Sequence, residues 1–197
     1  GYDVRSLQTF AMGLAVQTRG ACHNRALSYE LDVKGTVNRF KLEPGRGKLA
    51  MEKENFACIL DCLVLCKFLR NCFTDFYSEM ARIYTMTTGI PMTAEELEQV
   101  AVRVHNLKKA FNIREGWTKE DDWLPPRVFQ DPIPSGPSKG AVINPDDLRM
   151  AIEDYYLARG WTRDGLIPKS LLIELGLEDV AEEIGVEEAV ADMATGE

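Results

Sequence analysis

The most informative stretch of this sequence covers residues 54–68 and reads ENFACILDCLVLCKF. Its run of apolar residues predicts one largely buried helix from about Lys53 to Arg70. Asp61 lies in the middle of that run, and a buried carboxylate needs a partner because an unpaired charge is costly to remove from water. Cys66 follows, and in a reduced protein such a thiol is a possible metal or cluster ligand. What Asp61 and Cys66 hold therefore decides what this protein does.

Three cysteines of this stretch, Cys58, Cys62 and Cys66, are spaced four residues apart and fall on one stripe of an ideal helix. The outer two would lie about 12 Å apart along the axis, so the three cannot share one metal ion. Free cysteine often packs as a small apolar residue, and we interpret Cys58 and Cys62 as core. The spacing leaves the role of Cys66 open. Cys72 carries no signal beyond core or surface.

The residues alone favour a structural role for Asp61, as a cap for another element or as the partner of an arginine. His23 follows Cys22 and a glycine turn, a position that can face a cleft, although a lone histidine is more often structural. His105 belongs to an amphipathic segment and is interpreted as structural. A small zinc site built from Cys22, His23 and one helical cysteine is a weaker alternative. The sequence contains no complete active site.

Helical signals dominate the rest of the chain and predict an all-α fold, a multihelical orthogonal bundle with long ordered loops. Thr93 and Glu96 have the capping-box spacing, and Asn144 stands before Pro145 at a second helix start. Further predicted helices span residues 3–17, 74–88, 168–175 and 178–184, and glycines at 20, 89 and 160 mark helix ends.

Two segments are predicted to be loops. Residues 27–53 are rich in glycine and basic residues, and we expect mostly loop there with a short extended piece at Leu27–Leu31. Residues 116–143 contain five prolines, which exclude a regular helix or a central strand. That second segment is too long for a simple connector, so we expect it to wrap over a surface.

The net charge of −8 is concentrated at one end of the chain. Residues 177–197 hold eight acids and no Lys or Arg, leaving 23 acids against 23 bases elsewhere. We therefore expect a helical domain over 1–176 and an acidic helical or frayed tail over 177–197, and no nucleic-acid partner. No apolar run is long enough to span a membrane, and no signal peptide is evident. Five cysteines, an odd number, indicate a reduced, cytoplasmic protein.

With these motifs in place, the chain resembles the C-terminal, second helical domain of the aldehyde ferredoxin oxidoreductase family, the tungsten-bispterin enzymes. The matching stretches, in family order, are Arg19–His23, Glu54–Phe68, Met92–Leu97, Phe111–Gly116, Asp121–Asp122, Leu124–Arg127, Gly136–Gly140 and Tyr155–Trp161.

The resemblance implies a reaction and partners. In the family a tungsten held by two pterin dithiolenes oxidises an aldehyde to a carboxylate, and electrons pass through a [4Fe–4S] cluster to ferredoxin. Whether this chain's parent uses tungsten or molybdenum, and on which substrate, stays open. This chain would close the cofactor cleft from one side, would need the missing N-terminal domains of its parent, and would be inactive and cofactor-free alone. The alternative is a helical interaction module without a cofactor role.

The resemblance also assigns site residues through a motif of the form Asp-x-x-Gly-x-Cys. It implies that Asp61 binds the amine groups of a pterin, that the backbone near Leu65 contacts the same ring system, and that Cys66 is the fourth cluster ligand. His23 corresponds to a histidine of the substrate pocket, a candidate catalytic proton donor or acceptor. Val64 departs from the motif, because it stands where the family has glycine.

Simple chemistry agrees with these roles. A carboxylate accepts paired N–H groups, and a thiolate is the normal iron–sulfur ligand. On a regular helix Asp61 and Cys66 would point about 140° apart, one toward each cofactor. We expect the face that bears His23, Asp61 and Cys66 to be apolar and exposed, since its natural cover is absent.

Overall fold

A computed structural model describes residues 2–185, and this part of the chain contains ten α-helices and no strand. The all-α prediction is confirmed. The helices are α1 (Gln8–Ala15), α2 (His23–Ala26), α3 (Tyr29–Val33), α4 (Arg46–Cys62), α5 (Phe76–Thr88), α6 (Ala94–Arg114), α7 (Arg127–Gln130), α8 (Pro145–Ala158), α9 (Lys169–Glu174) and α10 (Glu178–Glu183). Short 3-10 turns lie at Val4–Ser6, Lys67–Asn71 and Lys119–Asp121.

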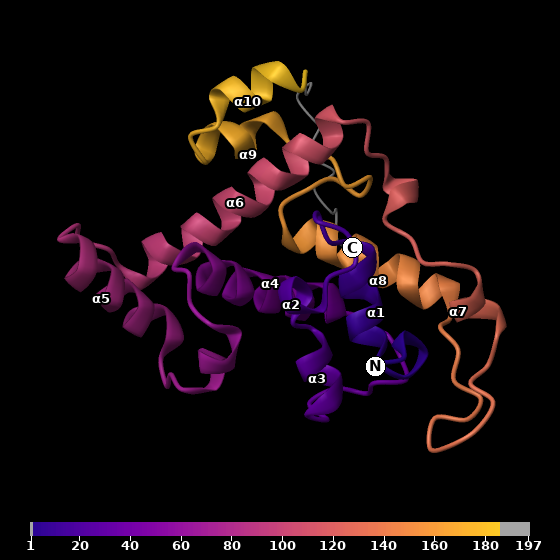
Figure 1. Cartoon of the computed structure of the whole chain (residues 1–197). Helices are drawn as coiled ribbons and strands as arrows, with labels where there is room; N and C mark the ends of the chain where they lie inside the picture. The colour runs from indigo at the N-terminus through magenta and orange to yellow at the C-terminus, as the bar shows by residue number, and fades with distance from the viewer. Residues whose placement is uncertain (1, 186–197) are drawn as a thin grey trace, which may run out of the picture.

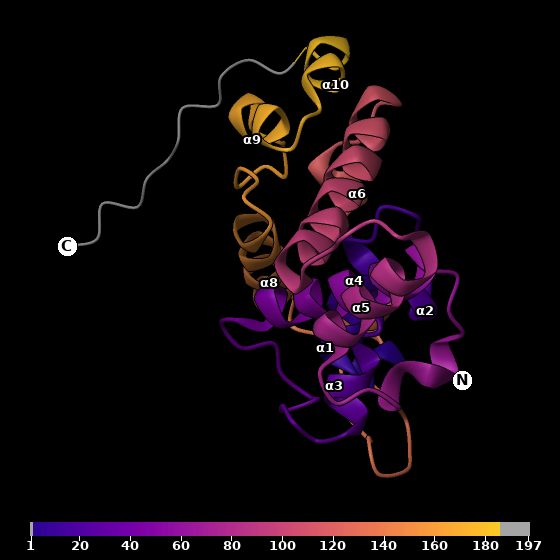
Figure 2. The same cartoon turned by 90° about the vertical axis from the view of Figure 1, so that its left-hand side faces the viewer.

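Helix α4 crosses the middle of the molecule and contacts α1, α2, α6 and α8 (Figure 1). The long helix α6 carries α5 at one end and reaches α10 at the other. Figure 2 shows α9 and α10 at the opposite end of the molecule from α3. Among the described helices, none combines the length and the hydropathy that a membrane span requires.

Local cap signals place several helix ends where the sequence predicts them. The Thr93 hydroxyl accepts from the Glu96 N–H, and the Glu96 carboxylate accepts from the Thr93 N–H, which completes the capping box of α6. The Asn144 side chain accepts from two backbone N–H groups at the start of α8. Gly89 ends α5 with φ of 74°. These helix ends are determined by residues close in sequence, so they can be predicted without knowledge of the tertiary structure.

The predicted limits of the central helix were wrong at both ends. Helix α4 begins at Arg46, seven residues before the predicted start, because Gly45 takes a left-handed conformation with φ of 83° and opens the helix. It ends at Cys62, so the predicted continuation to Arg70 does not form. Within the first turn, a Cβ on Gly47 would meet the Tyr155 backbone nitrogen at 2.2 Å. Glycine therefore permits the close contact of α4 with α8.

The extended piece predicted at Leu27–Leu31 was also wrong, because residues 29–33 form α3. Helix α3 is held in place by a tertiary contact of Asp32. This buried side chain accepts hydrogen bonds from the N–H groups of Thr9 and Phe10. These N–H groups lie in the first turn of α1 and have no partner inside their own helix. The carboxylate from α3 therefore caps α1 across a sequence distance that local patterns do not reveal.

The apolar core has two parts. The larger part lies around α1, α4 and α8, and the smaller part lies between α4, α5 and α6. Cys58 belongs to the smaller part and is 6% exposed, as expected for a core cysteine. Cys62 is exposed, so its assignment to the core was wrong. In the region of the expected acidic tail, α10 packs on α9 and α6, and residues 186–197 lie outside the described residues.

Candidate functional site at the end of α4

The end of α4 is a tight reversal built around Val64. The Leu65 N–H donates to the Leu60 carbonyl at 2.8 Å, and the Val64 N–H donates to the Asp61 carbonyl at 3.1 Å. Val64 takes a left-handed conformation, with φ of 55°, at the position after a helix end that glycine normally fills. The bulk of valine is tolerated there because its side chain is 91% exposed.

This reversal takes Cys66 out of the helix. Cys66 has extended backbone angles, with φ of −66° and ψ of 131°, and precedes the 3-10 turn at Lys67–Asn71. The expectation that Asp61 and Cys66 share a regular helix and point about 140° apart is therefore wrong. The separation of the two side chains instead comes from the chain reversal, which leaves the Cys66 thiol exposed.

Asp61 is held by two cations from different elements. Arg25, on α2, forms an ion pair with Oδ2, and the Lys67 ammonium lies 3.0 Å from Oδ1. Lys67 also donates to the carbonyl of Ala57 at 2.7 Å, which ties the turn to α4. The Asp61 side chain remains 29% exposed, so it keeps open lone pairs as well as two ion pairs.

The same turn is tied to α3 by a third cation. Arg70 donates to the Lys67 carbonyl at 2.8 Å and forms an ion pair with the buried Glu30. Lys34 also pairs with Glu30, at 3.3 Å. Elements α2, α3 and α4 and the turn after α4 are thus joined by charged contacts, which hold the site in one arrangement.

The immediate surroundings of Asp61 carry more positive than negative charge, because two cations face one carboxylate. Burial, followed by the nearby Arg25 guanidinium, lowers the pKa of Lys67 to about 8. Burial by itself disfavours the charged form of a lysine, and the neighbouring guanidinium adds to that effect.

The structure places the four predicted site residues around this helix end. His23 is exposed and begins α2, the single turn that also carries Arg25, the partner of Asp61. Leu65 is half-buried against the smaller core. None of the four is sealed in the interior. Val64 and Phe68, 91% and 86% exposed, flank Cys66 and provide exposed apolar surface beside it.

Sequence reasoning missed the named partners of Asp61. An arginine was considered, but Arg25 is 36 residues away and no local pattern selects it. The sequence did indicate Lys67 as a possible partner of Asp61, because it is a cation only six residues further along the chain and can pair with a carboxylate.

A buried network behind the site was also missed. Glu54 Oε2 accepts from the Tyr155 hydroxyl and from Arg159, each at 2.5 Å, and Asn55 Oδ1 accepts from Arg159 at 2.6 Å. The arginine and the glutamate are both buried. The sequence hinted at this network only through Glu54 and Asn55, two polar residues that begin an otherwise apolar stretch. The network fixes α4 against α8 and so positions the helix end.

A cleft of about 250 Å³ opens beside Asp61, and Glu54, Cys58, Cys62 and His105 also line it. Two buried atoms there, Glu54 Oε1 and His105 Nδ1, have no hydrogen-bond partner in the structure. Burial, and then the nearby Arg159, lowers the pKa of His105, so its ring is neutral. Within residues 2–185 no three His, Cys, Asp or Glu side chains are grouped to hold a metal, so the zinc alternative has no ligand set there.

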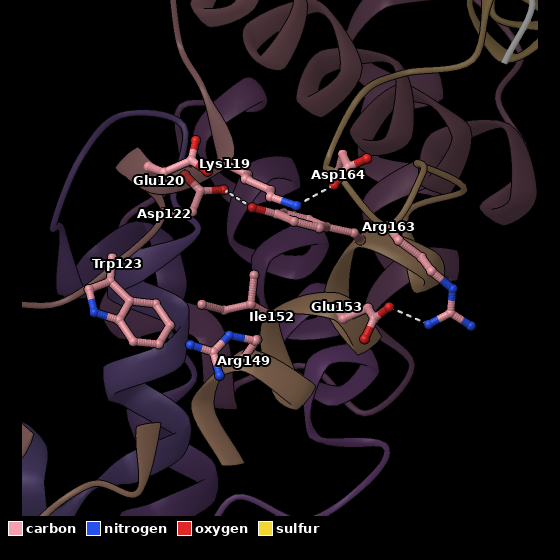
Figure 3. A pocket seen from close by; sticks show the side chains of 10 residues that line it. Lys119, Glu120, Asp122, Trp123, Arg149, Ile152, Glu153, Arg163 and Asp164 are labelled. Atoms are coloured by element: carbon pink, nitrogen blue, oxygen red, sulfur yellow. Dashed lines mark hydrogen bonds and ion pairs between the residues drawn. The ribbon is translucent and has the colours of Figure 1, made fainter. Parts of the chain in front are cut away.

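A larger hollow, of about 510 Å³, lies between α8 and the segment around Lys119 (Figure 3). Its rim carries the ion pairs Lys119–Asp164 and Arg163–Glu153. In its wall the Tyr156 hydroxyl donates to Asp122 at 2.7 Å. None of the predicted site residues lines this hollow, so it is separate from the helix end.

The donors at the helix end suit the groups that the sequence analysis named. A half-exposed carboxylate can accept N–H groups of a pterin ring, and an exposed thiol can become an iron–sulfur ligand. The Val64 side chain projects into solvent at the reversal and is 91% exposed. By residue type, the Asp61 carboxylate and the Cys66 thiol fit a pterin and one corner of a cluster.

The described residues form an all-α domain with a cation-rich helix end. The chain belongs to the aldehyde ferredoxin oxidoreductase family, whose model for domains 2 and 3 matches residues 1–177.

Individual relatives agree with the family match. The chain is 30% identical over 185 residues to the tungsten-containing aldehyde ferredoxin oxidoreductase of Pyrococcus abyssi (strain GE5 / Orsay), covering 90% of this chain and 29% of that protein. It is 26% identical to the aliphatic sulfonate oxidoreductase, WOR-like subunit, of Pyrococcus furiosus, covering 93% of this chain and 30% of that protein. The chain thus spans about three-tenths of the curated relatives' length.

A solved structure also matches. It is the active-site complex BamBC of benzoyl coenzyme A reductase with 1,5-dienoyl-CoA, at a TM-score of 0.61 and 25% identity. The match covers 73% of this chain and 21% of that chain.

Proposed function

We propose that this chain closes one side of the cofactor cleft in a tungsten- or molybdenum-pterin oxidoreductase that oxidises aldehydes to carboxylates. Electrons would leave through a [4Fe–4S] cluster to ferredoxin. The observation that carries the proposal is the reversal at Val64, which presents the Cys66 thiol and the Asp61 carboxylate from one short, cation-rich segment. The curated relatives named as tungsten-containing aldehyde ferredoxin oxidoreductases support the reaction class.

Each residue has a role that its environment supports. Asp61 would accept N–H groups of the pterin, with Arg25 and Lys67 orienting the carboxylate through their ion pairs. The backbone at Leu65 would contact the same ring system. Cys66 would supply one thiolate to the cluster. When bound, the metal–pterin group supplies the two-electron oxidation of the aldehyde.

His23 is the proposed proton carrier of the substrate pocket. Aldehyde oxidation by water releases protons, and imidazole changes charge close to neutral pH, so it can accept one and pass it on. His23 begins α2, the turn that also carries Arg25, and the centre of its ring lies 6.3 Å from that of Tyr29.

The exposed apolar side chains around Cys66 support a covering partner. Val64, Phe68 and Leu69 are exposed together on the segment that follows α4. Apolar surface of this kind commonly marks an interface. We assign the cover to the remaining domains of the same protein, which would also exclude water from the cofactors.

The test is the metal content and activity of the full-length protein that contains this chain. We expect tungsten or molybdenum together with iron and sulfide, and aldehyde-dependent reduction of a viologen dye. A His23→Ala variant should keep its metals and lose at least tenfold in kcat, since general acid–base groups typically contribute about 10²–10⁴-fold. A folded full-length protein without iron, tungsten or molybdenum would overturn the proposal and favour the interaction module.

A further inference from the structure

Cys58 and Cys62 form a close thiol pair on successive turns of α4. Their sulfur atoms lie 3.9 Å apart, within hydrogen-bonding distance for sulfur. The two thiols differ in access, because Cys58 is buried in the smaller core whereas Cys62 is exposed at the cleft. Cys62 is also the last residue of the helix, where the backbone is held by fewer hydrogen bonds than in the interior.

The charges around Cys62 favour its thiolate. Lys108 from α6, Arg25 from α2 and Lys67 from the following turn all act on this sulfur. The acids that line the same cleft, Asp61 and Glu54, are each paired with an arginine. The remaining titratable group there is His105, which is neutral because its pKa is lowered by burial. The net field at Cys62 is therefore positive.

The pair divides its protons unequally. The hydrogen bond from Cys58, with help from the surrounding cations, lowers the pKa of Cys62 to about 6. The same hydrogen bond, followed by burial, raises the pKa of Cys58. The lowered pKa and the exposure of Cys62 both favour it as the thiolate and nucleophile of the pair, with the buried Cys58 as the proton donor.

We propose that Cys58 and Cys62 form a peroxide-reactive dithiol site, in which Cys62 is the attacking thiol and Cys58 the resolving thiol. The co-reactant is hydrogen peroxide or an alkyl hydroperoxide. The Cys62 thiolate attacks one peroxide oxygen, the O–O bond breaks, and the leaving oxygen takes a proton, so that Cys62 becomes a sulfenic acid. Cys58 then loses its proton and attacks that sulfur. The S–O bond breaks, water leaves and an S–S bond forms, so two thiols and one peroxide give one disulfide and two waters, or one water and an alcohol.

The disulfide requires a change in the last turn of α4. A disulfide brings the sulfurs to about 2.05 Å and the Cβ atoms to about 3.8 Å, whereas residues four apart on a helix have Cβ atoms about 5–6 Å apart. The turn must therefore distort, and it contains Asp61. Oxidation would move Asp61 relative to Arg25 and Lys67, which links the thiol pair to the helix-end site. The thiol chemistry itself does not depend on the proposed function.

The test follows the thiols of the full 197-residue chain after reduction and brief treatment with stoichiometric hydrogen peroxide. Trypsin releases residues 54–67 as one peptide, which also contains Cys66. A Cys66→Ser background therefore leaves only the proposed pair in that peptide. We expect the peptide to lose two hydrogen atoms in mass, to resist alkylation and to recover both thiols with dithiothreitol.

Two variants and a control assign the roles. Cys58→Ser should stop at a sulfenic acid on Cys62 that dimedone traps, and Cys62→Ser should lower the rate of peroxide consumption at pH 7 at least tenfold. Cys72→Ser, which removes an exposed thiol outside the cleft, should change neither result. Peroxide that oxidises Cys72 or Cys66 first in the wild type, or a 54–67 peptide that keeps two alkylatable thiols, would overturn the proposal. The wild-type mapping gives this answer even if a variant fails to fold.

Discussion

The ammonium of Lys67 lies 3.0 Å from Oδ1 of Asp61, across the point where α4 ends. This contact, with the Lys67 hydrogen bond to Ala57, fixes the direction in which the chain leaves the helix toward Cys66. Lys67→Met should lower the free energy of unfolding by about 1–2 kcal/mol, since it removes a partly buried ion pair and the hydrogen bond to the Ala57 carbonyl. Lys48→Met, on an exposed face of α4, is the matched control and should change stability by less than about 0.5 kcal/mol. Urea unfolding followed by circular dichroism measures both, and equal midpoints would contradict the structural role of Lys67.

Val64 is strained in its left-handed conformation, and glycine should relieve that strain. The left-handed conformation costs a non-glycine residue about 1–2 kcal/mol. Glycine avoids this cost, but it also makes the unfolded chain more flexible, which offsets part of the gain in stability. Val64→Gly should therefore raise the free energy of unfolding by about 1 kcal/mol, with little packing lost from so exposed a side chain.

The control for this substitution is Val33→Gly, at an exposed valine that ends α3 with no left-handed backbone. It should lower stability, because glycine is a poor helix former. Thermal melts of the two variants should thus shift in opposite directions. A Val64→Gly melt below that of the wild type would show that the turn is not strained.

The buried pair of Glu54 and Arg159 should be the most sensitive charged contact in the fold. Arg159→Met leaves the Glu54 carboxylate buried with only the Tyr155 hydroxyl, and should cost about 3–5 kcal/mol of stability. Adding Glu54→Leu to the same chain should recover part of that loss, since an apolar pair avoids the unpaired charge. Arg149→Met, which breaks an exposed pair with Asp146, should cost less than about 1 kcal/mol. Similar losses for the Arg159 and Arg149 variants would contradict the account.

Lys109 gives the fold a dependence on pH. Burial lowers its pKa to about 8, although Asp122 accepts its hydrogen bond, whereas an unfolded lysine titrates near 10.4. Between these values the unfolded chain holds more protons at this position, so the free energy of unfolding rises with pH there. Below about pH 8 both states are protonated and the cost of burying the charge is fully present.

Lys109→Met removes this contribution, so the stability difference, wild type minus variant, should grow between about pH 8 and pH 10. Tyr156 shares the Asp122 carboxylate with Lys109, but its raised pKa affects stability only above about pH 10, where tyrosines of the unfolded chain ionise, so the comparison ends at pH 10. Chemical unfolding at a series of pH values measures the stability difference. Parallel pH profiles for the two proteins would show that Lys109 titrates as an ordinary lysine.

The parts of the fold that could be predicted are those determined by residues close together in the sequence. Two helix starts could be predicted, because the capping residue and the first turn lie within four residues of each other. They are marked by Thr93 with Glu96 and by Asn144 with Pro145. The end of α4 could not be predicted, because it depends on a left-handed valine where a helix end normally has glycine. The α3 helix was missed because Asp32 acts on α1, about 22 residues earlier in the chain.

The candidate site shows the same division. Asp61 and Cys66 could be selected from one short motif, since their residue types and spacing carry the chemistry. The partner Arg25 could not be selected, because it reaches Asp61 only after α2 packs on α4. The cysteine stripe was misread at Cys62 because helix periodicity assigns a face but not which part of that face opens to a cleft.

The most direct measurement is the iron content and the low-temperature electron paramagnetic resonance spectrum of the full-length protein with Cys66→Ser, beside Cys72→Ser. Both thiols are exposed in the structure, so the comparison matches access and changes only position. The account predicts that Cys66→Ser loses or alters the [4Fe–4S] signal and its iron, while Cys72→Ser keeps both. An unchanged cluster signal and full iron content in Cys66→Ser would contradict the assignment of the helix end to the redox centre.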